Sequence, residues 1–384
     1  MKNFKQKEIQ TYFYGTMYGL AIFMLVSLAS CNKETFTNNK GDLKDPATLK
    51  SKARVTVHSG SSIQSAVDAA GSNTIIYIEP GIYSESIVVN KPGIELIGLT
   101  GKGDVVIQNP GDEEDGVSVN ADGDGFVLKN VTVKGFEDNG VLLVGTDNFL
   151  LDHVIAIDNR EYGLFPVHCN NGVIENCTAT GSADTGIYVG QSSNITVTNN
   201  VAFANVSGFE IENCNNVKAT LNESYNNTAG LLVFLLPGLD VKSSSNILVS
   251  HNKIHDNNLA NFSTPEGGLE FFIPKGMGIL LLGADNTTIE HNLVRGNNFV
   301  GIAAVSTLLL GVLNGAPPEA FADIEPNPDG ARILHNVLQA NGKSAPPGLP
   351  LPAADLLWDG SGTNNCWQFN VFSSSYPASL PACN

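Results

Sequence analysis

The chain has 384 residues, with 21 Lys and Arg against 38 Asp and Glu, and a formal net charge of −17. Only 15% of the residues are charged, whereas 39 are Gly and 18 are Pro, a composition typical of a turn-rich β protein. A disordered polyanion and a helical bundle are both excluded, and the acidic balance argues against a nucleic-acid partner.

The first thirty residues are typical of an export signal. Lysines at positions 2, 5 and 7 precede an apolar stretch over residues 17–28, which predicts a signal peptide over residues 1–30. A retained membrane anchor is the alternative. Leu28-Ala29-Ser30-Cys31 resembles the bacterial lipobox, which implies a lipid on Cys31 and membrane anchorage in a bacterial cell envelope. Residues 31–54 are polar and are expected to form a flexible, lipidated tether.

The N-terminal segment of the folded region, residues 62–70, is predicted to form one short helix. Ser62 is an N-cap candidate, and apolar residues follow at helical spacing as far as Ala70. Such a helix can cover the open end of a stack of strands, which would otherwise recruit another strand.

A glycine followed by a short β-rich run then recurs along most of the chain. The intervals are 22 to 24 residues, apart from one of 48 that fits either one coil with an insertion or two coils. These glycines are Gly116, Gly140, Gly163, Gly186, Gly208, Gly230, Gly278 and Gly301. No single unit could bury its apolar face alone, so neighbouring units must stack. The Leu spacing does not fit a leucine-rich repeat, which leaves a parallel β-helix.

Asparagine marks the turns of these units. Asn130, Asn200, Asn252, Asn292 and Asn336 were aligned as one recurring position. A second Asn closes several units, at Asn205, Asn257, Asn297 and Asn341. Asn tolerates the left-handed backbone of sharp corners, and aligned Asn side chains are expected to hydrogen-bond from one unit to the next.

The entrance, with Glu79-Pro80-Gly81-Ile82-Tyr83, resembles the opening of pectate-lyase-like proteins. The resemblance implies an all-β fold, a right-handed parallel β-helix with an N-terminal capping helix and loop insertions. It covers residues 55–345 and leaves a C-terminal cap over residues 346–384. The repeat is also similar to NosD-type β-helix proteins.

The cysteines divide into two groups. Cys366 and Cys383 lie in an irregular C-terminal segment and are the best disulfide pair in an oxidising compartment. Cys169, Cys177 and Cys214 lie inside repeats and are expected to be small buried side chains.

Strand alternation selects the candidate catalytic residues. If the residue after each repeat glycine points inward, Glu210, Glu212 and Tyr188 point outward. Paired carboxylates on one face can divide acid and base roles. Asp184 is placed to join them from a corner, Phe165 and Phe234 to stack on a sugar, and Lys275 to bind substrate from the insertion near 259–277. Solvated surface glutamates are the alternative.

The segment Tyr162-Gly163-Leu164-Phe165-Pro166-Val167-His168 resembles the Tyr-Gly-Phe-Asp-Pro-His motif of mannuronan C5-epimerases. Tyr162, Gly163 and Pro166 match, whereas Phe165 and Val167 replace the Asp and His of the motif. The resemblance implies a catalytic role for Tyr162, with simple packing as the alternative. By strand alternation His168 is expected to point inward.

Two further clusters contain possible metal ligands, and neither is assigned as a metal site. His251, His291 and His335 share one column of the repeat, and the aligned residues of earlier units are Lys129, Asp152, Glu175, Asn199 and Leu221. A mixed column of this kind favours a solvent-facing position over a transition-metal site.

The acidic turn at 112–115, with Asp122 and Asp124 nearby, is typical of a solvated acidic turn. Weak Ca²⁺ binding there is the alternative, which makes Ca²⁺ the cofactor to test.

These observations predict a cell-envelope lipoprotein whose partner is a polysaccharide lying along the β-helix. If it is an enzyme, lyase or epimerase chemistry is implied by the resemblance. A non-catalytic glycan-binding or scaffolding solenoid is the alternative, because the fold hosts many activities.

Overall fold

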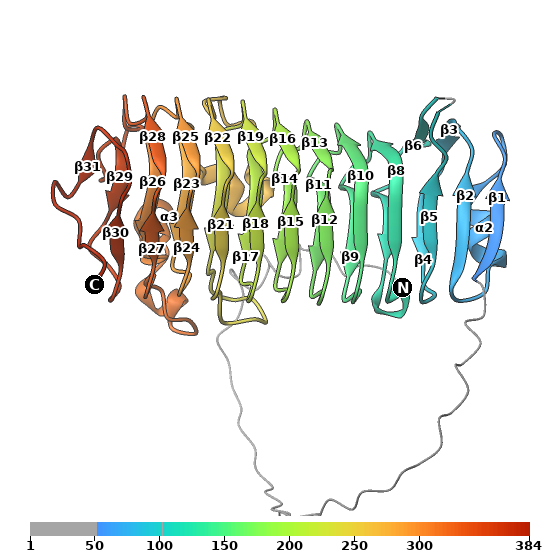
Figure 1. The fold of residues 1–384 in the computed structure, drawn as a ribbon, viewed down its shortest axis with the longest axis horizontal. Helices are drawn as coiled ribbons and strands as arrows, with labels where there is room; N and C mark the ends of the chain where they lie inside the picture. The colour runs from blue at the N-terminus through green and yellow to red at the C-terminus, as the bar shows by residue number, and fades with distance from the viewer. Residues whose placement is uncertain (1–51, 102) are drawn as a thin grey trace, which may run out of the picture. The chain divides into compact units, whose positions relative to one another are not determined.

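The structure is a computed structural model that describes residues 52–101 and 103–384. The predicted signal peptide, Cys31 and most of the tether lie outside the described residues. The folded unit, Ala53–Asn384, is built of parallel strands that belong to two sheets, one of 20 and one of 11 strands among the described residues. Figure 1 shows successive coils of these strands following one another in sequence order along the unit.

The 20-stranded sheet contains β1 (Ala53–Val57), β2 (Thr74–Ile78), β3 (Gly81–Ser84), β5 (Glu95–Gly98), β6 (Val105–Gln108), β8 (Val127–Lys134), β10 (Leu150–Ile157), β12 (Val173–Glu175), β13 (Thr178–Thr180), β15 (Thr196–Thr198), β16 (Val201–Phe203), β18 (Lys218–Thr220), β19 (Glu223–Tyr225), β21 (Leu248–Ser250), β22 (Lys253–His255), β24 (Thr288–Glu290), β25 (Leu293–Arg295), β27 (Arg332–Leu334), β28 (Val337–Gln339) and β30 (Cys366–Gln368). The 11-stranded sheet contains β4 (Ile87–Val89), β7 (Asp115–Val119), β9 (Asn139–Val144), β11 (Tyr162–Val167), β14 (Thr185–Gly190), β17 (Ser207–Glu212), β20 (Ala229–Phe234), β23 (Met277–Leu282), β26 (Val300–Val305), β29 (Ala354–Trp358) and β31 (Ser375–Tyr376).

The predicted capping helix is present as α2 (Ile63–Ala69). The hydroxyl of Ser62 accepts a hydrogen bond from the amide of Ser65, as an N-cap should. Glu85 adds a second cap from a later segment, because its carboxylate accepts the amides of Ile63 and Gln64 at 2.7 and 3.0 Å. A negative charge also complements the N-terminal end of the helix dipole. The helix contacts β1, β2 and β4, the first strands of the stack.

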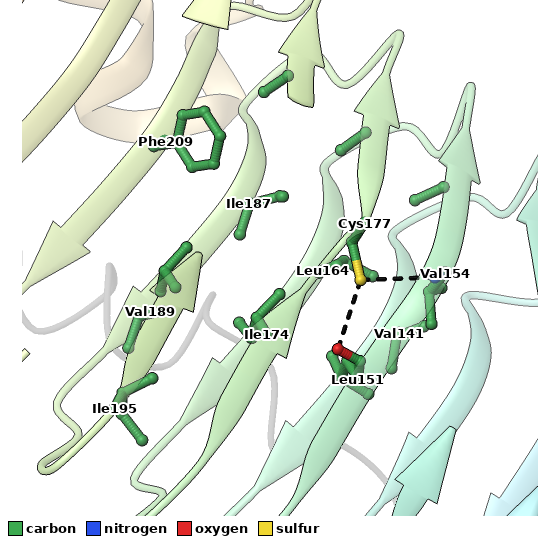
Figure 2. Packing of buried hydrophobic residues seen from close by; sticks show 14 of the residues in the cluster. Val141, Leu151, Val154, Leu164, Ile174, Cys177, Ile187, Val189, Ile195 and Phe209 are labelled. Carbon is green, nitrogen blue, oxygen red and sulfur yellow. Dashed lines mark hydrogen bonds between the residues drawn. The ribbon is translucent and has the colours of Figure 1, made fainter. Parts of the chain in front are cut away.

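The core lies between the two sheets and is made of aligned columns of apolar side chains. In the 11-stranded sheet, Ile187 pairs with Phe209 and Phe209 with Leu231, all of them buried. Figure 2 shows one such column, with Val141, Leu164, Ile187 and Phe209 from successive strands. The core confirms that the stacked repeats bury a continuous apolar interior.

The repeat glycines are required because the chain packs tightly at their positions. A Cβ atom added at Gly208 would lie 2.3 Å from the Ser224 hydroxyl and 2.7 Å from the Gly230 carbonyl oxygen. A larger side chain would therefore push neighbouring coils apart.

The three cysteines inside the repeats are buried free thiols, in accord with the expectation of small core side chains. Cys177 hydrogen-bonds to the Leu151 carbonyl oxygen and accepts the Val154 amide (Figure 2). Burial raises the pKa of the Cys177 thiol to about 12, so the sulfur stays protonated and inert.

Two ladders of buried asparagines run along the turns, which confirms the predicted stacking of Asn side chains. In each ladder the side-chain amide donates to the side-chain oxygen of the next Asn, at 2.9–3.2 Å. One ladder is Asn200, Asn222, Asn252, Asn292, Asn336 and Asn370. The other is Asn205, Asn227, Asn257, Asn297 and Asn341, which ends on the carboxylate of Asp355.

The predicted alignment of Lys129, Asp152 and Glu175 with the histidine column of later coils was wrong by one residue. Lys129 pairs with Asp152 and Asp152 with Glu175, whereas the next residues, Asn130, His153 and Asn176, form the corner column that later contains the histidines. Asn130 is therefore a corner residue at φ 55° and not a ladder member. A polar residue occurs at both adjacent positions, so residue type alone did not reveal the shift.

Two excursions cover the outer face of the late strands. The first contains the 3-10 helix η2 (Pro265–Phe272), and the second contains α3 (Leu308–Asn314) and the 3-10 helix η3 (Pro318–Phe321). Together with β20, β23 and β26 they form a second apolar cluster outside the main core. A small apolar cavity of about 50 Å³ remains among its side chains.

The coil continues beyond residue 345, into the segment assigned to a cap. β29 pairs with β26, β30 with β27 and β31 with β29, so the last coil is a regular one. Cys366 and Cys383 form a disulfide with a Cα–Cα distance of 4.8 Å. At the other end, β1 begins at Ala53, within the expected tether. Within the described residues, no helix has the length and apolarity needed to cross a bilayer.

Candidate active site

The outer face of the 11-stranded sheet has the predicted alternation. Phe209 and Ile211 lie in the core, whereas Glu210 and Glu212, which alternate with them along β17, lie on the outer face of the sheet. Glu210 pairs with Tyr188 on the preceding strand, and Glu212 pairs with Gly190. Gly190 leaves room for the Tyr188 side chain, because a Cβ atom at this position would lie 2.1 Å from the Tyr188 hydroxyl. The missing side chain lets the Tyr188 ring lie along its own strand towards Glu212.

The candidate residues are buried, which contradicts the alternative of solvated surface glutamates. Glu210 is 4% exposed and Tyr188 is 3% exposed. The insertion near 259–277 covers them: Glu270 of η2 reaches over the sheet, and the Ser207 hydroxyl donates to its carboxylate at 2.7 Å. Neither Glu270 nor Ser207 was selected from the sequence, because the insertion has no counterpart in other units.

Four carboxyl groups meet under this cover: Asp184, Glu210, Glu212 and Glu270. Oxygen atoms of Asp184, Glu210 and Glu270 all lie within 4.8 Å of one another. The Thr185 hydroxyl is placed 2.8 Å from Glu210 and 3.1 Å from Asp184. Asp184 therefore joins the glutamates from the corner before β14, where it was expected.

Burial is the main influence on the protonation of these groups. It raises the pKa of Asp184, Glu210 and Glu270 well above the usual range, and the charges of neighbouring carboxyls raise each pKa further. The pKa of Glu212 is raised to about 7 by burial, against hydrogen bonds from Glu210 and Tyr188 that lower it. These four groups therefore retain protons at a pH where surface carboxyls have lost them.

Hydrogen bonds link three of these carboxyls into a chain. Glu270 shares a side-chain hydrogen bond with Glu210, and Glu210 shares one with Glu212. Tyr188 hydrogen-bonds to Glu212 as well and lowers the pKa of its carboxyl. Glu212 is half-buried, whereas Glu210 and Glu270 are buried, so Glu212 is the most solvent-exposed member of the chain.

An aromatic cluster adjoins the carboxyls. Tyr162 stacks on Phe165 with ring centroids 4.3 Å apart, and Tyr188 lies 4.6 Å from Phe165. Tyr162 also hydrogen-bonds to Asp184. Burial raises the pKa of Tyr188 well above its usual value, and nearby Glu212 and Glu210 raise it further, which opposes its use as a tyrosinate base.

The remaining predicted site residues are not brought together here. Phe234 is 2% exposed and packs in the second apolar cluster under the excursions, so it is not a free stacking surface. Lys275 is exposed, and within the described residues no Lys or Arg is hydrogen-bonded or ion-paired to the four carboxyls. Arg160, two residues before Tyr162, lies 3.6 Å from the Glu137 carboxylate and is ion-paired there.

His168 does not point inward, contrary to the strand-alternation argument. It follows the end of β11 and has a positive φ of 56°, so it is a corner residue to which alternation does not apply. Its Nε2 atom lies 3.8 Å from the Asp240 carboxylate. The epimerase-like segment therefore contributes Tyr162 and Phe165, and not its histidine, to the aromatic cluster.

Acidic groups close enough to share a cation occur at two places in the described part of the chain. These are Asp184, Glu210 and Glu270, and a more exposed set of Asp285, Glu325 and Asp329. In the first set, burial and the charges of the neighbouring carboxyls raise the pKa of each group. The acidic turn at 112–115, considered for Ca²⁺, is not among these ligand sets.

Comparison with known proteins identifies the repeat. The family described as "Right handed beta helix region" matches residues 115–236 and 234–344, more than half of the chain. No curated protein matches the sequence.

Several solved structures share the fold. The A-module of mannuronan C-5 epimerase AlgE4 from Azotobacter vinelandii superposes with a TM-score of 0.58 at 18% identity, over 82% of this chain and 91% of that one. A GH136 lacto-N-biosidase from Eubacterium ramulus gives a TM-score of 0.54 at 13% identity, over 84% and 68% of the two chains. At these identities the likeness establishes the fold alone.

Proposed function

The chain belongs to the right-handed β-helix family, and from that premise we propose that it is a glycan-acting protein whose acid–base group is Glu212. The observation that carries this proposal is the position of Glu212. It is the half-buried end of a chain of hydrogen-bonded acids, has a pKa of about 7, and adjoins an aromatic cluster. A carboxyl with such a pKa can donate and accept protons near neutral pH.

A carbohydrate partner fits the neighbouring side chains. Val144 lies in the same column as Glu212, three coils earlier, and is 37% exposed, so it offers apolar surface of the kind that packs against sugar rings. In this column Val167 is 9% exposed, and Phe234, one coil beyond Glu212, is 2% exposed. The column is thus more open on the β9 side of Glu212 than on the β20 side, and a glycan would reach Glu212 from there. Phe165 and Tyr188 are 8% and 3% exposed and are too buried to stack on a sugar. The matching structures named as a mannuronan epimerase and a lacto-N-biosidase support a carbohydrate substrate.

The lack of a Lys or Arg partner among the described residues favours a neutral glycan and hydrolysis of its glycosidic bond. A uronate would add negative charge to a site of four carboxyls, and no Lys or Arg among the described residues contacts them to offset it. Elimination or epimerisation at a uronate, the reactions implied by resemblance, also requires a base and a cation for the enolate-like intermediate. Tyr188 and Lys275 are not arranged to supply them. Hydrolysis needs no cation: Glu212 would give its proton to the leaving sugar oxygen, and a second carboxylate of the cluster would take the proton of the water that attacks the anomeric carbon.

The test is incubation of the purified full chain with neutral glycans, alginate and pectate, following new reducing ends and unsaturated-uronate absorbance. We expect reducing ends from one neutral glycan, and Glu212→Gln should lower the rate about a hundredfold or more. Glu319→Gln, at an exposed position of η3, is the matched control. Saturable binding without turnover would replace the enzyme with a glycan-binding solenoid. Turnover that survives Glu212→Gln would remove Glu212 from the mechanism.

We further propose that the protein is lipid-anchored in a bacterial cell envelope through Cys31. The support is the signal-like segment over residues 1–30 and the lipobox resemblance, both outside the described residues. In a bacterial expression host, Cys31→Ala should move the protein from the membrane fraction to the soluble fraction, as measured by fractionation and immunoblotting. An unchanged membrane fraction would point to a retained apolar anchor instead.

A further inference from the structure

Three histidines form a stacked column on the 20-stranded sheet, away from the carboxyl cluster. His251, His291 and His335 follow β21, β24 and β27, and all three are exposed. The ring centroids of His251 and His291 are 5.0 Å apart, and those of His291 and His335 are 4.9 Å apart. The planes of the second pair differ by only 4°.

The backbone holds these rings in register. Each histidine has a left-handed conformation, with φ between 53° and 58°, at the same corner of consecutive coils. The strands on both sides of the corner are paired in register, for example β21 with β24 and β22 with β25. The imidazoles are therefore presented on a rigid edge at the spacing of neighbouring β-strands.

In His251, one ring nitrogen already makes a hydrogen bond. The Nδ1 atom of His251 lies 2.6 Å from the Ser250 hydroxyl, a contact that orients the ring. A hydrogen bond at one nitrogen leaves the other, Nε2, available as a ligand and fixes its direction.

We propose that this column binds one divalent transition-metal ion, such as Zn²⁺ or Ni²⁺, through two neighbouring imidazoles at a time. Metal–nitrogen bonds of about 2 Å require the two nitrogens to lie within ~4 Å of each other. The observed rings are stacked, with planes 23° and 4° apart in the two pairs, so both rings of a pair must rotate about their side-chain bonds for their nitrogens to converge on one ion. His251 and His335 are two coils apart, about 10 Å, and cannot share an ion. His291 belongs to both available pairs, and water or anions complete the coordination.

The pairing predicts an asymmetric result that simple stacking does not. Losing His251 or His335 leaves one intact pair, and losing His291 leaves none. Binding by a second imidazole on the same rigid edge is intramolecular, so a pair binds far more tightly than a single ring. His291 should therefore matter much more than either outer histidine.

The experiment is calorimetric titration of ZnCl₂ into the full chain, purified through a tag free of histidine. Asn is the appropriate replacement, because Asn130, Asn176 and Asn199 occupy the same corner in other coils with the same positive φ. His153→Asn is the matched control, since His153 occupies this corner without a histidine on either side. Circular dichroism of each variant confirms that the fold is retained.

We expect one high-affinity Zn²⁺ per chain. His291→Asn should weaken its binding at least about tenfold, whereas His251→Asn and His335→Asn should each weaken it only about twofold. His153→Asn should leave it unchanged. Equal losses in all three ladder variants, an effect of His153→Asn as large as that of His291→Asn, or no saturable binding in the wild type would each overturn the proposal.

Discussion

Raising the pH from 5 to 8 is expected to destabilise the protein, and Glu210→Gln should remove a large part of that loss. Asp184, Glu210, Glu212 and Glu270 all have raised pKa values in the folded protein. A carboxyl with a raised folded pKa stabilises the fold fully below its unfolded pKa. This contribution is lost as pH rises through the folded pKa.

For Glu212, the pKa rises from 4.5 to about 7, which corresponds to a loss of about 3 kcal/mol between pH 4.5 and 8. The other three carboxyls act in the same direction. Asp152, Glu223 and Asp323 have lowered pKa values and act in the opposite direction, but only towards acid pH. Stability should therefore be greatest near pH 5.

Glu210→Gln tests the cluster directly, because Gln keeps one donor for Glu212 and one acceptor for Glu270 but cannot ionise. The urea midpoint of the variant should exceed that of the wild type at pH 8 and nearly equal it at pH 5. Histidines also titrate in this range, so the comparison between variant and wild type is made at each pH separately. Glu319→Gln, on the exposed η3, should change neither value.

Glu210→Gln should also keep η2 packed against the 11-stranded sheet at pH 8. Glu270 fixes η2 to the sheet through Ser207 and Glu210, and ionised carboxyls would repel it. At pH 8, chymotrypsin should cleave after the exposed Phe271 and Phe272 more slowly in Glu210→Gln than in the wild type. A wild-type protein that is as stable at pH 8 as at pH 5 would show that the carboxyls are relieved by water or by a cation.

The fold was predictable because it depends on requirements that recur in every coil. Only glycine fits where Gly208 meets the next coil, and the buried asparagines must recur to form a ladder. Strand alternation likewise placed Glu210 and Glu212 on the outer face. Each of these inferences uses the repeat itself, and a long repeat averages out local ambiguity.

The environment of the site was not predictable, because it depends on segments that occur once. Glu270 lies in an insertion that has no counterpart in other coils, so no repeat position indicates that its carboxyl meets Ser207 and Glu210. Without that cover, the burial of Glu210 and the position of Phe234 in a second apolar cluster could not be derived. The corner column was misaligned at His153 because adjacent positions there are both polar.

Asn252→Ala should be among the most destabilising single substitutions in the chain. The Asn252 side-chain oxygen accepts the backbone amide and the side-chain amide of Asn222, at 2.9 and 3.0 Å. Its own amide donates to the Ala219 carbonyl at 2.9 Å. Alanine would leave the buried Asn222 backbone amide and the Ala219 carbonyl without this partner, at about 1–3 kcal/mol each. The Asn222 side-chain amide would lose one of its two hydrogen bonds and keep the one to the Val197 carbonyl.

We expect a total loss of about 4 kcal/mol or more, measured as a lower urea midpoint. Asn199→Ala is the control: Asn199 is exposed at a corner with φ 56°, so its replacement should cost only about 1 kcal/mol of backbone strain. Because each coil contacts mainly its neighbours, the damage should also be local. Hydrogen exchange should accelerate first at the Asn222 amide and then in β18, β19, β21 and β22. A loss no larger than that of the control would mean that water replaces the missing side chain, and that the ladder defines the register of the coils more than it stabilises them.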